Sequence, residues 1–496
     1  MVIPDKIGLV LIILYSICLS ILFIYAINSF YLLILKKKSK RNKNLPPFLL
    51  HQTLPFITVQ LPVFNEKYVV RQLLESITSL HYPKEKIQIQ ILDDSTDETT
   101  SIIKELAGKY KSSGFNILHL HRTNRIGFKS GALREGLDKA DGEFIAIFDA
   151  DFTPDPDFLL KMLPYFDDEK IGLVQARWTH SNENSSILTK VQAMGLDGHF
   201  LIEQDGRNSA GLFINFNGTA GLFRKACILD AGNWQDDTIT EDLDLSFRAQ
   251  LKGWNFVFRS DITCLGELPE NISSCKSQQY RWTKGAIETC SKILPLVWRS
   301  SFGIGIKIQS TLHLTVNFVY PMILIAGILN FPLLLFKNQG LNHTSSFNWM
   351  GIFLLSFISS ILVYWFFQNR SEKSILRKII MFPVYLAFSA GLSLNNTKAL
   401  LSGLFKRKSE FVRTPKFHIL DSNPKIKSNG YLNSKMNIQI GIEMVLGIYC
   451  VLGALLAVYF SEFAVLPFIL LFGIGYLMMG LFSLRQIAEQ KQKEII

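Results

Sequence analysis

The sequence predicts an α/β domain inserted between membrane-spanning helices. Long apolar segments lie toward both ends of the 496-residue chain, whereas residues 51–299 have the mixed composition of a soluble domain. Within that central region, apolar runs of strand length alternate with helical patterns, which is typical of a mostly parallel sheet covered by helices. Ligands of such sheets bind beyond the carboxyl ends of the strands, so the residues that follow each strand are candidates for a site.

The first apolar segment, residues 7–35, predicts a membrane helix because about 20 apolar residues suffice to cross a bilayer. A secretory signal peptide begins with basic residues and ends in a small-residue cleavage site. Here the basic cluster, residues 36–43, follows the apolar run instead. We therefore expect an uncleaved helix whose C-terminal end faces the cytoplasm.

The central region predicts an ordered series of strands and helices. Its apolar runs are bounded by polar and turn-forming residues, and the runs between them have helical periodicity. Strands are expected at residues 57–64, 87–92, 115–120, 144–148 and 172–176, and helices at residues 68–80, 96–110 and 241–250. The alternation favours parallel strands joined by crossover helices.

The C-terminal region predicts further membrane helices, at residues 312–336, 347–367, 438–460 and 463–484. Residues 379–404 contain Pro383 and a polar run at residues 395–398, and they are expected to be a poor continuous span. If they do not span, every basic segment falls on the cytoplasmic side, in agreement with the positive-inside rule. This favours about five spanning helices and one interfacial helix.

Composition limits the classes of partner. The net charge is +11, and much of the basic charge flanks apolar segments, which indicates a membrane protein rather than a nucleic-acid-binding one. The six cysteines have no CxxC pair and no zinc-site spacing, so we expect them to be reduced packing residues.

Acidic pairs follow two of the predicted strands. Asp93 and Asp94 follow the strand at residues 87–92, where they can accept hydrogen bonds from a base or ribose; alternatively, Asp94 or Ser95 simply caps the next helix. Asp149 and Asp151 follow the strand at residues 144–148. In extended chain these two project to the same side and can ligate a hard divalent cation beside a diphosphate.

Two further motifs lie nearer the C-terminal membrane region. Glu241 and Asp242 open a predicted helix, where acidic residues interact favourably with the helix dipole and a general base would stay ionised. Gln278, Arg281 and Trp282 form a QxxRW motif. Its guanidinium and indole suit a phosphate and a sugar ring, or alternatively an anchor at the membrane interface.

The order DD, DxD, TED and QxxRW resembles the signature of processive family 2 glycosyltransferases, which include cellulose, chitin and hyaluronan synthases. Longer segments, such as residues 61–66, 124–133 and 216–221, are similar to the cellulose-synthase-like A and C proteins, whose A members are mannan and glucomannan synthases. The resemblance implies a GT-A-type (Rossmann-like) catalytic domain inserted between transmembrane helices. It divides the chain into residues 1–45, a cytosolic catalytic domain at 46–300, and a C-terminal membrane domain at 301–496.

The resemblance also implies a role for each motif residue. Asp242 is the implied general base, and Mg²⁺ or Mn²⁺ is the implied cofactor. The implied contacts are Asp93, Asp94, Lys129, Asp149, Gln278 and Arg281 for nucleotide and diphosphate, Asn217, Gly218 and Trp282 for the acceptor, and Asp149 and Asp151 for the metal. Residues 411–416, within a candidate gating segment at about 405–425, resemble the loop that covers the nucleotide in these synthases.

The implied activity is inverting transfer of a hexose from GDP-mannose or UDP-glucose to a growing β-linked polysaccharide, with export through the membrane domain. One alternative is transfer of a single sugar to a lipid, as in ceramide glucosyltransferases. Another is a transporter or scaffold with an inactive domain, which would lack one of the acidic positions. The expected partners are the nucleotide sugar, a glycan acceptor and the lipid bilayer, without nucleic acid. The expected location is the cytoplasmic membrane of a bacterium or the Golgi of a plant-like cell.

Overall fold

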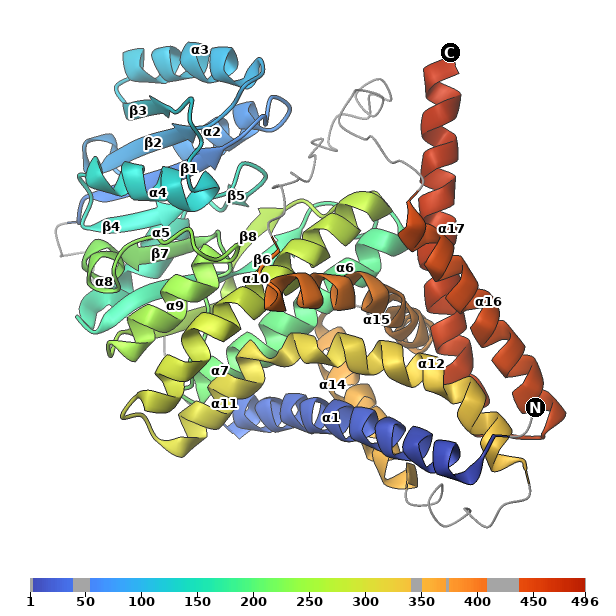
Figure 1. The fold of residues 1–496 in the computed structure, drawn as a ribbon. Coiled ribbons are helices and arrows are strands. Elements are labelled where there is room, and N and C mark those ends of the chain that lie inside the picture. Colours follow the sequence, from blue (N-terminus) through green and yellow to red (C-terminus); the bar gives the residue numbers. More distant parts are fainter. Residues whose placement is uncertain (1–2, 39–53, 340–349, 372–373, 408–436, 496) are drawn as a thin grey trace.

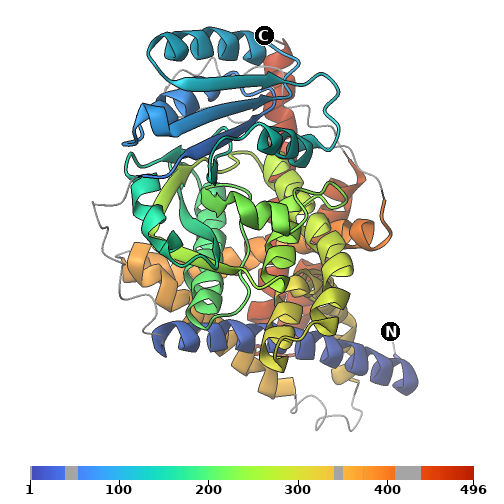
Figure 2. The ribbon, with the colours of Figure 1, turned by 90° about the vertical axis from the view of Figure 1, so that its left-hand side faces the viewer.

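The computed structural model describes residues 3–38, 54–339, 350–371, 374–407 and 437–495. A sheet covered by helices lies at the upper left of Figure 1, and the long apolar helices gather at the lower right. Figure 2 shows the first helix crossing the bottom of the molecule, below the sheet. The candidate gating segment lies almost wholly outside the described residues.

Eight strands form one mixed sheet in the described part of the chain, in the order β3-β2-β1-β4-β7-β6-β8-β5. The strands are β1 (Ile57–Val63), β2 (Ile87–Asp93), β3 (Asn116–His121), β4 (Phe144–Ile147), β5 (Thr153–Pro154), β6 (Ile171–His180), β7 (Gly221–Arg224) and β8 (Asn255–Gly266). Strands β3, β2, β1 and β4 are mutually parallel, as predicted. The other half is not, because β7 runs antiparallel to both β4 and β6.

Two apolar layers enclose the sheet. One face packs against α2 (Val70–Thr78), α3 (Thr99–Ser112) and α5 (Phe158–Met162). The other face packs against α4 (Phe128–Asp138), α8 (Lys225–Asp230) and α9 (Glu241–Leu251). Central strands β1 and β2 are buried along almost their whole length, and the polar side chains within them hydrogen-bond across the two strands, Thr58 with Gln88 and Gln60 with Gln90.

A helical segment connects the sheet to the apolar helices. It consists of α6 (Ile187–Gly198), the π-helix η3 (His199–Gln204), α7 (Asp205–Ser209), α10 (Ile272–Arg299) and α11 (Ile304–Leu314). The remaining short elements are the 3₁₀ helices η1 (Lys84–Lys86), η2 (Leu163–Asp167), η4 (Val316–Phe318) and η5 (Met350–Phe353). Helix α10 packs against the long apolar helix α15 (Ile375–Leu404) and also against α9 and α11.

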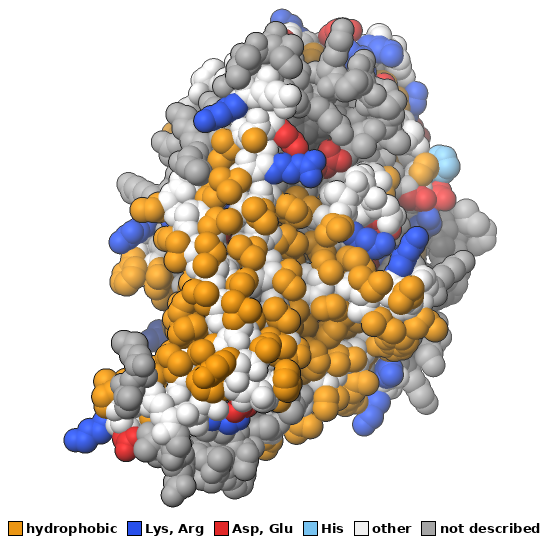
Figure 3. Space-filling model, turned by 90° about the vertical axis from the view of Figure 1, so that its right-hand side faces the viewer, with side chains coloured by type: hydrophobic (Ala, Val, Ile, Leu, Met, Phe, Trp, Pro, Cys, Tyr) orange, Lys and Arg blue, Asp and Glu red, His pale blue; other side chains and the backbone are white. Residues whose placement is uncertain are grey.

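The apolar group consists of α1 (Asp5–Lys38), α12 (Val319–Lys337), α14 (Leu354–Ser371), α15 (Ile375–Leu404), α16 (Ile438–Tyr459) and α17 (Leu466–Ile495). Among the described residues, five helical segments are long and apolar enough to cross a membrane: 5–38, 316–337, 375–404, 438–459 and 466–492. Figure 3 shows a broad apolar surface with charged side chains gathered mostly toward its ends. Exposed residues of α16 and α17, such as Val445, Leu455 and Ile474, are suited to contact with lipid.

One expectation for this region needs correction. Residues 375–404 form a single unbroken helix that is long and apolar enough to span, although the sequence suggested a poor continuous span. The buried amides of Asn395 and Asn396 hydrogen-bond each other, and Asn395 donates to the carbonyl of Lys276 in α10. The polar residues therefore serve helix packing. The interfacial position of α15 stays a prediction.

Candidate active site

A cavity of about 260 Å³ opens beyond the carboxyl ends of β1, β2 and β4, where the fold predicts a ligand. It is lined by nearly every residue that the sequence motifs singled out. The predicted residues that line it are Asp94, Lys129, Asp149, Asp151, Asn217, Gly218, Asp242, Gln278, Arg281 and Trp282. Motifs that are far apart in the sequence therefore meet in one place.

The end of the cavity beside β2 holds an anchored carboxylate. Arg122 Nε and Nη2 donate to the two oxygens of Asp94, each at 2.7 Å. The guanidinium of Arg125 lies 3.3 Å from the centre of the Phe64 ring and also lines the cavity. A fixed acceptor beside a flat aromatic–guanidinium pair is suited to a nucleobase.

Asp93 does not line this cavity, in contrast to its neighbour. Its side chain is fully buried, and Oδ1 accepts a hydrogen bond from the backbone N–H of Ser95 at 2.9 Å. Its Oδ2 lies 3.0 Å from His119 Nε2 and 3.2 Å from His121 Nδ1. The Asp93 carboxylate therefore links the ends of β2 and β3, and its expected contact with the nucleotide stays a prediction.

The DxD motif is held by the loop that precedes β7. The Thr219 hydroxyl accepts a hydrogen bond from the backbone N–H of Asp149 at 2.9 Å. The Lys129 ammonium donates to Asp149 Oδ1 at 2.5 Å and to the carbonyl oxygen of Gly218 at 2.8 Å. Lys129 thus lies between the DxD motif and the loop that precedes β7, although a lone lysine in a sequence is more often exposed to solvent.

Lys129 remains a cation in these surroundings. Burial alone lowers the pKa of its ammonium, but the negative charges of Asp149 and Glu241 more than offset burial, and the net pKa is raised. A cation held this way can stabilise negative charge that gathers on a leaving diphosphate.

Gly218 lies against the proposed base. Its φ is +85°, and a methyl group added at its Cα would lie 3.1 Å from Asp242 Oδ2 and 3.5 Å from Lys129 Nζ. A glycine is therefore favoured here by both the backbone conformation and the close approach of two functional side chains.

Asp242 occupies the first turn of α9. Its Oδ1 accepts a hydrogen bond from the backbone N–H of Leu243 at 2.8 Å. Burial raises the pKa values of both Asp242 and Glu241, and the proximity of the two carboxyl groups raises that of Glu241 further. A carboxylate with a raised pKa is a better proton acceptor than an ordinary aspartate.

Helix α10 fixes the TED turn from the other side. The Glu288 carboxylate accepts a hydrogen bond from the backbone N–H of Ile239 at 3.1 Å, and the hydroxyls of Thr240 and Thr289 lie 3.1 Å apart. The Cα of Gly285 lies so close to Thr240 that an added methyl group would be 2.6 Å from its side chain. One turn of α10 therefore packs directly on the start of α9.

The QxxRW residues lie on the same helix and line the cavity. Burial lowers the pKa of Arg281 to about 10, so its guanidinium remains charged near neutral pH. A desolvated guanidinium binds anions strongly, which supports a phosphate contact at this position.

The donor set fits a hard divalent cation. Asp149 and Asp151 present carboxylates to one cavity, and Asp149 Oδ1 already attracts the Lys129 ammonium. Carboxylate oxygens are the ligands that Mg²⁺ and Mn²⁺ prefer.

Several residues of the site carry no motif that would predict them from the sequence. The structure alone reveals the contacts of Asp94 with Arg122 and Arg125, and of Arg125 with Phe64. His199 hydrogen-bonds with Asn217, their Nε2 and Oδ1 atoms being 3.0 Å apart, across a sequence separation that no motif covers. The HxH pattern at residues 119–121 was a readable signal, because both imidazoles project from one face of a strand.

The mixed sheet, with a cavity at the carboxyl ends of its parallel strands, is the architecture of a GT-A-type glycosyltransferase. The family model "Glycosyl transferase family 2" matches residues 58–228, and "Glycosyl transferase family group 2" matches residues 144–388. The chain belongs to glycosyltransferase family 2 and is a hexosyltransferase.

Two similar relatives indicate to which members of family 2 the chain is related. The chain is 34% identical to glucomannan 4-beta-mannosyltransferase 1 of Oryza sativa subsp. japonica, over 77% of this chain and 72% of the relative. It is also 34% identical to glucomannan 4-beta-mannosyltransferase 2 of Arabidopsis thaliana, over 76% of this chain and 69% of the relative. The predicted resemblance to the cellulose-synthase-like A group is confirmed.

A solved structure supports the fold. The mannosyltransferase PcManGT from Pyrobaculum calidifontis, in complex with GDP-Man and Mn²⁺, matches with a TM-score of 0.58 at 16% identity. The match covers 80% of this chain and 100% of that one. This confirms the predicted α/β GT-A-type architecture.

Proposed function

We propose that the protein is a membrane-embedded inverting mannosyltransferase that moves mannose from GDP-mannose to a growing β-linked polysaccharide. One observation carries the proposal: Lys129, Asp149 and Asp242 meet around Gly218 in a chain similar to glucomannan 4-beta-mannosyltransferases. These relatives are mannosyltransferases by name, and of the two expected donors GDP-mannose is the one that carries mannose. Transfer of one sugar to a lipid is the competing activity.

The residues of the cavity divide the reaction between them. Asp242 Oδ2 removes the proton from the acceptor hydroxyl, which attacks the anomeric carbon from the face opposite the diphosphate. Lys129 and Arg281 stabilise the charge on the departing diphosphate. A Mg²⁺ or Mn²⁺ ion at Asp149 and Asp151, when bound, supplies further charge neutralisation. A single displacement inverts the anomeric centre, so an α-linked donor gives a β-linkage.

The acceptor subsite is proposed at Asn217, Gly218 and Trp282. Asn217 is fixed by Gln175, whose side-chain oxygen accepts from its backbone N–H at 3.2 Å, and by the contact with His199. Trp282 offers an apolar face for a sugar ring. Asp94 and Gln278 are assigned to the nucleotide and the diphosphate.

A second cavity supports export of the product. It has a volume of about 850 Å³ and lies among α1, α12, α14, α15 and α17, with His199 and Glu203 in its wall. Since His199 also contacts Asn217, the π-helix η3 borders both the acceptor loop and this cavity. The two cavities together form a candidate path from the site of transfer into the apolar helices.

The catalytic domain is assigned to residues 46–300 and to the cytosolic side of the membrane. Lys36, Lys37 and Lys38 form the last turn of α1, and Lys36 pairs with Asp205 of that domain at 2.8 Å, which agrees with the positive-inside rule. Protease added to sealed, outside-out vesicles should spare the domain, and cleavage within residues 46–300 there would refute the assignment.

Donor choice provides the test. Membranes that contain the protein would receive radiolabelled GDP-mannose or UDP-glucose with Mg²⁺ and Mn²⁺, alongside membranes that contain the Asp242→Asn variant. The proposal expects incorporation from GDP-mannose that depends on Asp242. Incorporation from UDP-glucose alone would refute the donor, and an active Asp242→Asn variant would refute the base.

A further inference from the structure

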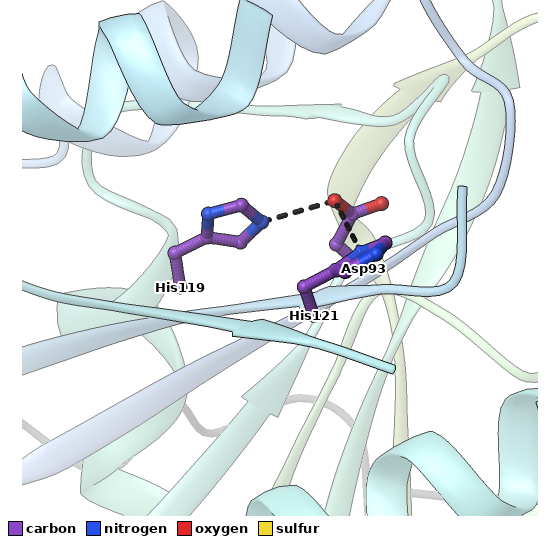
Figure 4. A group of neighbouring side chains, drawn as sticks. All are labelled: Asp93, His119 and His121. Carbon is purple, nitrogen blue, oxygen red and sulfur yellow. Dashed lines mark hydrogen bonds and ion pairs between the residues drawn. The ribbon is translucent and has the colours of Figure 1, made fainter. Parts of the chain in front are cut away.

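Two histidines and an aspartate converge outside the catalytic cavity, at the open edge of the sheet. His119 and His121 project from one face of β3, the terminal strand, toward Asp93 at the end of β2 (Figure 4). Asp93 Oδ2 lies 3.0 Å from His119 Nε2 and 3.2 Å from His121 Nδ1. One potential ligand atom from each residue lies within 4.8 Å of the other two.

These separations suit a coordination sphere. Ligands at about 2.0–2.1 Å from a tetrahedral zinc ion are separated from one another by roughly 3.3 Å. The spacing of the Asp93 oxygen from each imidazole nitrogen is close to that value. The parallel register pairs Asp93 with His121 and Ile91 with His119, so the backbone already places all three side chains on one face.

The surroundings provide both anchoring and access. The Asp93 side chain is 0% exposed, and its second oxygen is held by the Ser95 backbone, which orients the carboxylate as an outer-sphere hydrogen bond orients a metal ligand. The side chains of His119 and His121 are 16% and 36% exposed. A buried anion with two partly exposed imidazoles leaves the solvent side open for entry of an ion and for water ligands.

We infer that Asp93, His119 and His121 form a site for a borderline transition metal, with Zn²⁺ as the best match. Two imidazole nitrogens and one carboxylate oxygen are typical zinc ligands. The set differs from the all-oxygen pair Asp149 and Asp151, so the two sites take different ions.

Such an ion would link the edge strand β3 to β2 at the point where the donor cavity begins. Asp94, the next residue after Asp93, lines that cavity and is held by Arg122. The site would therefore stabilise the position of Asp94 without contacting the reacting atoms. The inference concerns metal binding alone and does not depend on which sugar the enzyme transfers.

The chain offers a matched control. His81 Nδ1 lies 2.8 Å from Asp157 Oδ1, both side chains are well exposed, and the pair lies outside this cluster. A lone histidine–aspartate pair supplies two ligands where the cluster at Asp93 supplies three. His81→Asn should therefore leave metal binding unchanged.

The test uses the full chain, purified in detergent, stripped with a chelator, incubated with ZnCl₂ and desalted. Metal content is measured by mass spectrometry, and cobalt substitution reports the ligand geometry by its visible spectrum. We expect about one zinc per chain in the wild type and in His81→Asn, and none in the variant that carries both His119→Asn and His121→Asn.

A variant with one substitution separates a loss of zinc binding from misfolding of the double variant. His121 is the most exposed of the three, and His121→Asn should weaken zinc binding at least tenfold, because even the loss of an outer-sphere partner costs about 10–100-fold. Zinc content in the wild type no higher than in the double variant would overturn the inference and leave Asp93 as a hydrogen-bond acceptor only. A tetrahedral cobalt spectrum that persists in the double variant would also overturn it.

Discussion

Replacement of Gly218 by alanine tests the geometry of the site most sharply. The residue has a φ of +85°, and its added methyl group would lie 3.1 Å from Asp242 Oδ2 and 3.5 Å from Lys129 Nζ. Gly114 provides a matched control, because its φ is +87° and an added methyl group would have no neighbour within 4 Å. The two variants therefore share the backbone strain and differ in the contact with the proposed base.

The expected loss of stability follows from the backbone strain, and the expected loss of rate follows from the contact with Asp242. A non-glycine residue in the left-handed region costs about 1–2 kcal/mol, which both variants should lose in stability. Only Gly218→Ala must also displace Asp242 or the loop, and a misplacement on the order of 1 Å costs about 10²-fold in rate. We expect kcat/KM to fall by roughly 10²-fold, equivalent to about 2.7 kcal/mol, in Gly218→Ala alone.

The assay is donor turnover by the purified protein at several donor concentrations, with thermal unfolding measured in parallel. Similar shifts in Tm with a loss of activity confined to Gly218→Ala would support the reasoning. Full activity in Gly218→Ala, or equal losses in both variants, would refute the placement of Gly218 against a catalytic carboxylate.

Three further predictions concern buried charges. Asp242→Asn should lower turnover by about 10²–10⁴-fold. Its Tm should stay the same or rise, because burial disfavours the charged carboxylate that the substitution removes; a lower Tm would indicate a structural role instead. Because burial raises the pKa of Asp242, kcat should fall with acidification at a higher pH than an ordinary aspartate would give; a pH–rate profile that stays flat down to the normal aspartate range would contradict this. Glu443 is fully buried, and its Oε2 lies 2.7 Å from Lys276 Nζ, so Glu443→Gln should lower the free energy of unfolding by about 3 kcal/mol in chemical denaturation. The double variant Glu443→Leu/Lys276→Met should recover most of that loss, because it leaves no unpaired buried charge; equal losses in the two variants would contradict this explanation.

Much of the fold could be predicted from the sequence. The parallel strands β1, β2 and β4 are short runs rich in Ile, Val, Leu and Phe, so their positions could be predicted to within one or two residues. The antiparallel half of the sheet could not be predicted in this way. Strand β7 has only four residues, and β8 contains Arg259, Ser260 and Asp261 beside an irregular register with β6, so neither gave a clear periodic signal.

The site was predictable where a motif carries the chemistry and unpredictable where a long-range contact does. The motif residues after β4, at the start of α9 and in the first half of α10 line one cavity. The sequence could not separate Asp93 from Asp94, because neighbouring residues of a strand face opposite sides and only the fold tells which side holds the cavity. Arg122 and His199 act through partners distant in the sequence, which a single chain does not reveal.

The size and linkage of the product test the central claim most directly. Purified membranes would be supplied with radiolabelled GDP-mannose, and the product would be sized and then digested with β-mannanase or, separately, cellulase. The account predicts a long polymer that β-mannanase degrades and cellulase leaves intact. A short labelled product that extracts into organic solvent would contradict it and indicate a lipid glycosyltransferase.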